Sequence, residues 1–286
     1  MSAGPAGGAR RGAWFAAPVA LFMLVCFGLP ILIVAWYSLM EPRSFALTGD
    51  LTLANYAAAV SEGYGKPMMW SLLGAAITTL VCALLAWPAA VILHRHAGRW
   101  ASLVSALIAL PIFISESVRL FGLSVFLMPR GGILAGSIEA LTGLRIGSIL
   151  NTWSAALVGM TYVHLPFMLF PLVLGVSLIP ADRMEAARDL GASRWQVFRE
   201  VELPLAAPGL AIGALLVFVL SLGANAEAAI LGGRAVTVVT TAIEQRFNYA
   251  QDWPMGAALT MIVIAITAAI VLPALARLDL DRLTRR

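Results

Sequence analysis

Four polar residues within otherwise apolar stretches are the first candidates for chemistry. Glu116 and Arg119 stand three residues apart, so on a helix they share one face and can neutralise each other. Asn225 and Glu227 lie near the end of a later apolar stretch. Ionisable groups at bilayer depth mark a transport pathway by default. We therefore take these four residues as candidate pathway residues, with a structural ion pair or a place at the outer membrane surface as the alternative.

Metal, cofactor and catalytic chemistry find no support in the remaining residues. The histidines and cysteines are dispersed and give no metal-ligand spacing, and we expect His164 to be a packing residue rather than a ligand. No nucleophile, base and orienting group stand together as an enzyme site requires. A phosphate-binding loop requires G-x-x-x-x-G-K-[ST], whereas the only lysine, Lys66, is followed by Pro67. The sequence predicts no catalytic residue, no metal, no cofactor and no ATPase site of its own.

The composition predicts that the elements holding these residues lie in a membrane. Hydrophobic residues make up 60% of the 286 residues and charged residues 12%, against roughly 45–50% and about 25% in soluble domains. The net charge of +4 does not indicate nucleic-acid binding, because there is one lysine and the arginines are spread along the chain. Arginines kept on cytoplasmic loops make a membrane protein basic without any nucleic acid.

Six apolar stretches predict an all-α integral membrane protein with six transmembrane helices. A helix requires roughly 20 mostly apolar residues to cross the bilayer. The six predicted spans are residues 14–39, 70–93, 103–127, 153–178, 208–231 and 254–275. The first stretch is 26 residues long, whereas the apolar region of a secretory signal has about 7–15. We therefore expect an uncleaved first helix, although the two arginines before it also suggest a signal sequence.

The distribution of arginine and lysine predicts that both termini are cytoplasmic. With this orientation 12 of these residues lie in cytoplasmic segments and 6 in outer segments, as the positive-inside rule requires. The predicted organisation is then a cytoplasmic tail (1–12), a first helix with an outer loop (13–69), a transmembrane domain (70–276) and a second cytoplasmic tail (277–286).

The cytoplasmic loop at 180–204, between the fourth and fifth spans, is predicted to form two short amphipathic helices. Asp182 is expected to cap the first helix, with Glu185 in the capping-box position. Gly191 is expected to end that helix with a left-handed backbone. Such a segment is too polar to enter lipid and too well capped to be a loose linker.

The second short helix of this loop is predicted to begin at Ser193 and to end at Pro204. Ser193 caps it and Gln196 stands at the third helical position. Amphipathic helices of this kind dock on other proteins, lie on the membrane surface or pack on their own neighbours. The residues alone leave these three uses open.

The loop resembles the EAA loop of binding-protein-dependent ABC importer permeases. That loop has the pattern E-A-A, three residues, G, nine residues, I, one residue, L-P. The chain matches it with valine in place of isoleucine as the only departure, at Glu185, Ala186, Ala187, Gly191, Val201, Leu203 and Pro204. Segments 163–168, 185–191 and 252–259 are similar to the spermidine/putrescine-type branch. Segment 221–227 and Glu116 beside Arg119 depart from that branch, so the solute stays open.

The resemblance implies a type I ABC importer permease fold in the bacterial inner membrane. It implies a dimer of cytoplasmic ABC ATPase subunits, a second permease subunit that is a related chain, and a periplasmic solute-binding protein. The solute would be small and charged, polyamine-like or related. Contact with the ATPase would involve the matched loop residues together with Arg188 and Asp189, and we expect Glu185 and Gly191 to matter most.

Two other classes of function compete with the importer. A secondary transporter or channel driven by an ion gradient predicts inverted repeats and acidic residues near mid-span. The acidic residues here lie toward one side, and such a protein would have no use for an EAA loop. A membrane-embedded enzyme would require the reactive residues that the chain does not offer.

Overall fold

The computed structural model describes residues 16–46, 48–96, 98–128, 132–143, 147, 149–233 and 236–277, and these are helical without a β-strand. The chain forms two compact units, one of residues 1–65 and 242–266 and the other of residues 66–241 and 267–286. The predicted tail at 1–12 and residues 278–286 of the second predicted tail lie outside the described residues.

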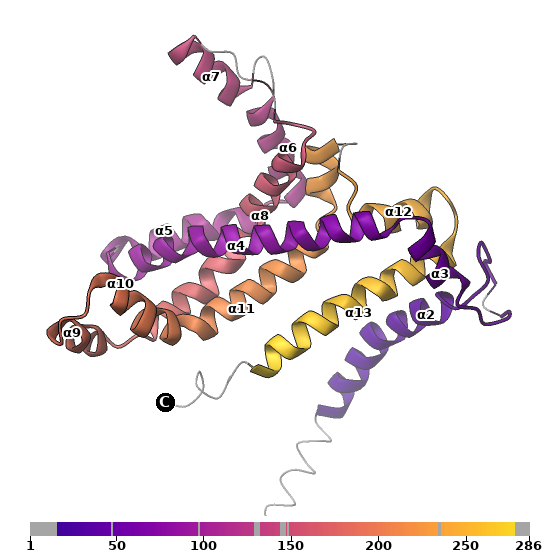
Figure 1. Ribbon diagram of the computed structural model, residues 1–286, viewed down its shortest axis with the longest axis horizontal. Helices are drawn as coiled ribbons and strands as arrows, with labels where there is room; N and C mark the ends of the chain where they lie inside the picture. Colours follow the sequence, from indigo (N-terminus) through magenta and orange to yellow (C-terminus); the bar gives the residue numbers. More distant parts are fainter. Residues whose placement is uncertain are drawn as a thin grey trace, which may run out of the picture. The chain divides into compact units, whose positions relative to one another are not determined.

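Five helices in the described part are long and apolar enough to cross a membrane (Figure 1). They span Ala16–Tyr37, Gly65–Arg95 (α4), Trp153–Ser177 (α8), Arg194–Leu222 and Trp253–Arg277 (α13). The first contains a π-helical turn at Leu24–Gly28 (η1), followed by α2 (Leu29–Tyr37). The first, second, fourth and sixth predicted spans each correspond to one of these helices, with ends that differ by a few residues.

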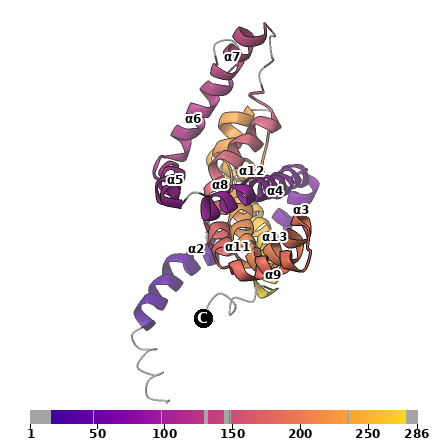
Figure 2. The same cartoon turned by 90° about the vertical axis from the view of Figure 1, so that its left-hand side faces the viewer.

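The third predicted span is not one straight helix. Helix α5 (Ala101–Ala109) and the 3-10 turn η3 (Leu110–Phe113) are followed by α6 (Glu116–Leu127), at an angle of 100° (Figure 2). Ile114 and Ser115 have extended backbones, and this interrupts the helical hydrogen bonds between the two parts. The described residues thus contain six candidate spans only if this bent pair is counted as one. The short helices η2 (Gly98–Trp100) and α7 (Ile133–Thr142) flank the pair.

The fifth predicted span differs at both ends. Helix α10 (Arg194–Gln196), the π-helical η4 (Val197–Glu202) and α11 (Leu203–Leu222) form one continuous run. The prediction that Pro204 ends the loop helix is therefore wrong. Proline has no N–H to donate, and a π-helical turn immediately before it relaxes the spacing of backbone bonds. At the other end the span stops at Leu222 instead of residue 231, and η5 (Ala228–Gly232) follows as a separate turn.

Close packing of α8 on α11 organises the larger unit. A Cβ atom added at Gly209 would lie 2.4 Å from the carbonyl oxygen of Pro171, and one at Gly175 would lie 2.9 Å from the carbonyl oxygen of Ala206. Glycine at both positions lets the two backbones approach, as small residues do between membrane helices. A buried cluster that includes Cys82 of α4, Leu172 of α8 and Val217 of α11 fills the space among the three helices.

The smaller unit has its own apolar cluster. Ala59 of α3 (Ala54–Ser61) packs with Met255 and Leu259 of α13, and Ile243 of α12 (Val239–Asn248) covers them. Asn55 is buried and donates to the carbonyl oxygens of Ser38 and Met40, at 3.1 and 2.7 Å. These bonds fix the chain that leaves the first span.

Candidate functional site

The loop at 180–204 begins with α9 (Ala181–Asp189). Pro180 occupies the N-cap position and no side chain caps the helix, so the prediction that Asp182 is the cap is wrong. Asp182 lies instead within the first turn, where a carboxylate interacts favourably with the helix dipole. Proline at the N-cap sets an extended backbone before α9, with φ −66° and ψ 131°.

The turn between the two loop helices has the predicted left-handed glycine. Gly191 has φ +86°, a conformation that residues with a Cβ atom rarely adopt. The Ala192 N–H donates to the Ala187 carbonyl at 3.0 Å, and the Gly191 N–H donates to the Arg188 carbonyl at 2.9 Å. These bonds satisfy carbonyl groups at the end of α9.

The predicted capping box of the second loop helix is present. The Ser193 hydroxyl accepts from the Gln196 N–H at 3.3 Å, and the Ser193 N–H donates to the Gln196 side-chain oxygen at 2.8 Å. Two backbone donors are thereby satisfied within four residues. The loop is therefore a defined pair of helices rather than a loose connection.

The surface of the loop is polar with two large apolar side chains in solvent. Leu190 is 89% exposed and Trp195 65% exposed. The seven residues matched to the EAA pattern, together with Arg188 and Asp189, differ in their exposure. The exposed residues are Glu185, Ala186, Arg188, Asp189, Gly191 and Pro204; Ala187, Val201 and Leu203 are half-buried.

Two contacts made by η4 hold the loop to the end of α4, and neither was predicted. Arg95 Nη1 lies 2.9 Å from Glu202 Oε1, and the Trp87 ring meets the Phe198 ring edge-on at a centroid distance of 5.2 Å. Both pairs join residues more than 100 positions apart, so no local pattern indicates them. The loop is thereby fixed to α4 by an ion pair and a ring contact.

A second polar site is buried inside the larger unit. Glu227 is fully buried just before η5, and its Oε1 atom lies 3.7 Å from Nε2 of His164 on α8. His164 Nδ1 lies 3.1 Å from the hydroxyl of Ser221 on α11. Gly159 makes room for this segment, because a Cβ atom there would meet Leu231 at 2.3 Å. His164 is thus buried as predicted, and its contact with a carboxylate was not predicted.

Several charged atoms of this interior site have no hydrogen-bond partner. They are both carboxylate oxygens of Glu227 and the Nε and Nη1 atoms of Arg119. Glu116 and Arg119 act on Glu227 electrostatically. The ion pair between Glu116 and Arg119, which was the alternative to a pathway role, is not found in the part of the chain that the structure describes. We define Arg119, His164 and Glu227 as the interior cluster.

The other two candidate pathway residues have different surroundings. Glu116 is exposed at the first position of α6. Asn225 is half-buried and its side-chain oxygen accepts from the Thr241 hydroxyl at 2.8 Å. Of the four predicted residues, Arg119 and Glu227 therefore belong to the interior cluster. Glu116 lies at the surface, and Asn225 has a hydrogen-bond partner.

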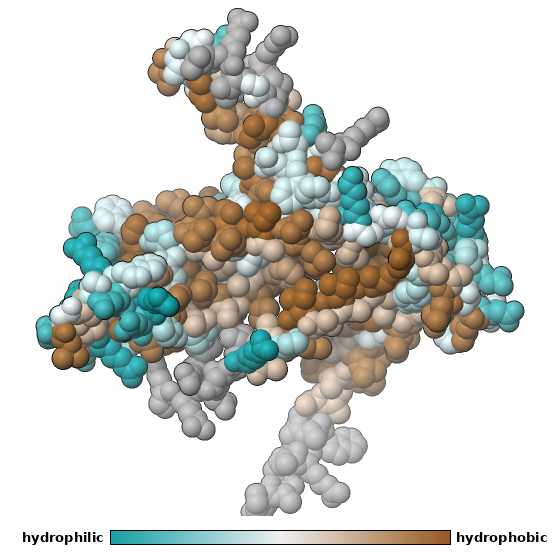
Figure 3. All heavy atoms as spheres, viewed as in Figure 1, coloured by the Kyte–Doolittle hydropathy of each residue, from teal (hydrophilic) through white to brown (hydrophobic). Residues whose placement is uncertain are grey.

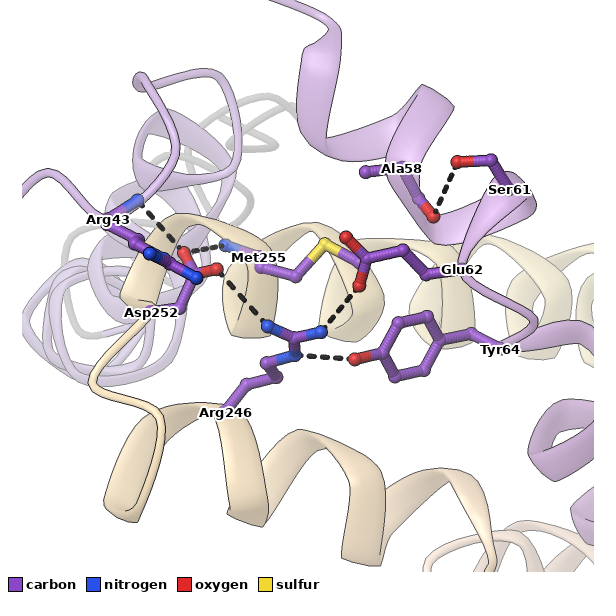
Figure 4. Close-up of polar contacts among 8 residues, drawn as sticks. All are labelled: Arg43, Ala58, Ser61, Glu62, Tyr64, Arg246, Asp252 and Met255. Carbon is purple, nitrogen blue, oxygen red and sulfur yellow. Dashed lines mark hydrogen bonds and ion pairs between the residues drawn. The ribbon is translucent and has the colours of Figure 1, made fainter.

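A third polar cluster lies in the smaller unit (Figure 4). The Arg246 guanidinium contacts Glu62 at 2.6 Å and Asp252 at 3.5 Å, and it donates to the Tyr64 hydroxyl. Asp252 also accepts from the Arg43 backbone N–H at 3.1 Å. Burial opposes the charge of Arg246, but the Tyr64, Glu62 and Asp252 oxygens outweigh it and raise the pKa of the guanidinium. These charges are mutually satisfied, which suits a structural clasp.

Comparison with known proteins shows which family the chain belongs to. The family of binding-protein-dependent transport system inner membrane components matches residues 88–285. The spermidine/putrescine transport system permease protein PotB of Haemophilus influenzae is 31% identical over 250 residues, 84% of each chain. The molybdenum transport system permease protein ModB of Mycobacterium bovis is 30% identical over 255 residues, covering 84% of this chain and 95% of that protein.

A solved structure has the same arrangement of helices. It is a bacterial alginate ABC transporter in complex with a periplasmic protein that holds an alginate pentasaccharide, and one of its chains matches with a TM-score of 0.74. The match covers 92% of this chain and 93% of that chain at 16% identity, so it supports the fold alone. The expected type I importer permease fold is confirmed. The chain belongs to the family of binding-protein-dependent transport system inner membrane components and is a permease subunit of an ABC importer.

Proposed function

We propose that this permease imports a small charged solute, polyamine-like or related, using ATP hydrolysed by a separate pair of cytoplasmic ATPase subunits. A periplasmic binding protein delivers the solute, and a second, related permease chain completes the pore in the bacterial inner membrane. The observation that carries the proposal is the loop at 180–204, which is both internally fixed and exposed.

The loop has the properties of a docking element. Its helices are held by Gly191 and the Ser193 capping box, while Leu190 and Trp195 leave apolar surface uncovered. A rigid helix with an exposed apolar anchor fits a groove on a partner protein. We infer that Glu185 supplies a polar contact there and that Ala186 permits close approach.

The same loop is placed to transmit movement into the membrane. Residues 194–222 form one helical run, so a force on α10 acts directly on α11. The Arg95–Glu202 ion pair passes the same movement to α4. Switching a two-state pore from 1:99 to 99:1 requires about 5.5 kcal/mol of differential binding. Rigid helical connections are what allow an external ATPase pair to supply that amount.

The interior cluster is the proposed solute-contacting part of the pathway. Buried polar atoms without hydrogen bonds cost free energy, so a structural role does not account for the Glu227 oxygens and the Arg119 nitrogens that lack them. A charged solute passing between them would satisfy one or the other. Glu116 and Asn225 are proposed to line the approach to this cluster.

The sign of the solute charge follows from no single residue. Glu227 favours a cationic group and Arg119 an anionic one, and the related proteins are named for spermidine/putrescine and for molybdenum. The polyamine-like proposal rests on the similarity of segments 163–168, 185–191 and 252–259 to the spermidine/putrescine-type branch.

The test uses the complete transporter reconstituted into vesicles, with the binding protein outside and nucleotide inside. Radiolabelled spermidine, putrescine and molybdate are compared in the presence of ATP, a non-hydrolysable ATP analogue or ionophores that abolish ion gradients. We expect uptake of one of these solutes that requires ATP hydrolysis and survives the ionophores. Uptake that is abolished by ionophores and indifferent to ATP would assign the protein to the ion-driven transporters instead.

A further inference from the structure

A pocket of about 890 Å³ lies in the larger unit between the last turns of α4 and the loop at 180–204. Its volume is in the range of pockets that bind small molecules, about 300–1,000 Å³. One wall is apolar and includes Trp87, Val91 and Ile92. The opposite wall carries cationic side chains from two directions, Arg188 on α9 and Arg194 on α10. The site is therefore amphipathic.

The charge of the pocket is predominantly positive. Arg95 and Glu202 both line it, but they neutralise each other at 2.9 Å. Arg188 and Arg194 form no ion pair within the described residues, and His96 adds a third basic group to the rim. Two guanidinium groups that line one pocket are suited to a phosphate, because each presents a fork of donors to its oxygens.

The apolar wall includes an exposed part of α4. Ile92 is 58% exposed and stands one turn before the end of a helix that is long enough to cross the bilayer. The rings of Trp87, Phe198 and Trp195 follow one another at centroid distances of 5.2 Å. Aromatic residues gather at the level of lipid headgroups. Hydrophilic residues cover α9 and α10 and hydrophobic ones cover the neighbouring part of α4 (Figure 3).

We propose that this pocket binds an anionic phospholipid of the cytoplasmic leaflet. Its phosphate lies between Arg188 and Arg194, and an acyl chain follows Val91 and Ile92 along α4. Basic pockets at the cytoplasmic side of transmembrane helices bind acidic headgroups in this way. The bound lipid joins α4 to both helices of the loop at 180–204, the proposed coupling loop, and it does so whichever solute the importer carries.

The experiment measures lipid retained by the purified complete transporter. The transporter is reconstituted with phosphatidylcholine alone or mixed with phosphatidylglycerol, extracted in mild detergent and weighed by native mass spectrometry. We expect the native protein to retain phosphatidylglycerol selectively. Since each arginine near an acidic lipid surface contributes about 1 kcal/mol, the double substitution Arg188→Gln and Arg194→Gln is expected to weaken retention roughly thirtyfold.

A matched control removes the same charge from the same part of the loop. Arg183 and Arg199 are exposed and do not line the pocket, so Arg183→Gln with Arg199→Gln is expected to leave retention unchanged. Substitution of Arg188 and Arg194 by lysine keeps the charge and is expected to keep most of the retention, which separates charge loss from misfolding. Equal retention by the pocket variant and the control variant would overturn the proposal.

A final arm separates a lipid headgroup from a soluble anion. Glycerol 3-phosphate and inorganic phosphate are added to the detergent-solubilised transporter as competitors. Because they lack the acyl chain that the apolar wall contacts, we expect neither to displace phosphatidylglycerol at equal concentration. Displacement by either anion would assign the pocket to a soluble phosphate compound and reject the lipid.

Discussion

The coupling loop and the interior cluster place polar groups in opposite situations. In the loop, residues within a short stretch of sequence satisfy one another, and Ser193 and Gln196 exchange two hydrogen bonds while their neighbours are exposed. In the cluster, residues from distant helices meet in the interior, and Arg119 and Glu227 keep buried atoms without partners. The difference fits the proposed roles, a rigid loop that meets the ATPase and a cluster that meets a charged solute.

The largest expected effect comes from replacing the glycine that joins the loop helices. Gly191→Val puts a β-branched residue at φ +86°, where residues with a Cβ atom are strained by about 1–2 kcal/mol. The helices must then change their relative direction. We expect solute-stimulated ATP hydrolysis by the complete transporter to fall at least tenfold, with membrane insertion unaffected.

The matched control for this substitution is Gly143→Val. Gly143 has φ +70° and, like Gly191, has no atom within 4 Å of an added Cβ, but it ends α7 outside the loop. The two variants carry the same kind of backbone strain. Equal stimulation of ATP hydrolysis in both would mean that the angle at Gly191 does not serve coupling.

The cluster is expected to show a trade-off between stability and transport. Glu227→Gln removes a buried charge whose two oxygens lack hydrogen bonds. Relief of about 1 kcal/mol would raise Tm by about 2–4 °C in a protein of this size. Uptake measured in vesicles should fall about tenfold, because the solute loses its ionic partner.

Glu41→Gln is the control for that result, since Glu41 is exposed just after the first span. It should change neither Tm nor uptake. A Glu227→Gln protein that unfolds at a lower temperature and transports normally would show that the cluster is structural.

The clasp around Arg246 offers the opposite case, a charge cluster with its partners in place. Arg246→Ala removes contacts to Glu62, Tyr64 and Asp252 together, and we expect a loss of about 1–3 kcal/mol of stability. Thermal unfolding should show it as a lower Tm. Arg43→Ala is the control, because Arg43 contacts Asp252 through its backbone N–H, which alanine keeps. An equal decrease in Tm in both variants would mean that the side-chain contacts of Arg246 do not stabilise the protein.

The smallest effect is expected at the loop cap. Ser193→Ala removes the side-chain half of the capping box and costs about 1 kcal/mol. Hydrogen exchange of amides 194–198 should become about fivefold faster. Ser177→Ala removes an exposed hydroxyl bonded to the Leu174 carbonyl at 2.8 Å and should leave those amides unchanged; no acceleration in either variant would mean that the box does not stabilise the loop.

Local patterns in the sequence were sufficient for most of the helices and for part of the loop. Apolar length predicted four spans closely, and Gly191 and Ser193 were predicted because their backbone roles depend on adjacent residues. Two loop predictions failed for a reason that is also local. Pro180, not Asp182, occupies the N-cap position. The π-helical turn before Pro204 allows the helix to continue through this proline.

The interior site depended on contacts that no local pattern contains. The bend at Ile114 and Ser115 and the early end of α11 at Leu222 determine where Arg119 and Glu227 lie. His164 joins them only because α8 packs against α11 at two glycines. The sequence shows that each of these charged residues is unusual within a membrane span. It does not show which other residue each of them contacts.

Directed cross-linking of the loop tests the central claim most directly. In a background with Cys26→Ala and Cys82→Ala, Ala187→Cys is placed in the loop and Ala140→Cys on α7. Each complete transporter is treated during ATP hydrolysis with a reagent that joins a thiol to a lysine amine of a neighbouring protein. We predict that Ala187→Cys alone becomes linked to the ATPase subunit and that this linkage stops solute uptake. Absence of a link from position 187, or full uptake once it has formed, would contradict energy transfer through this loop.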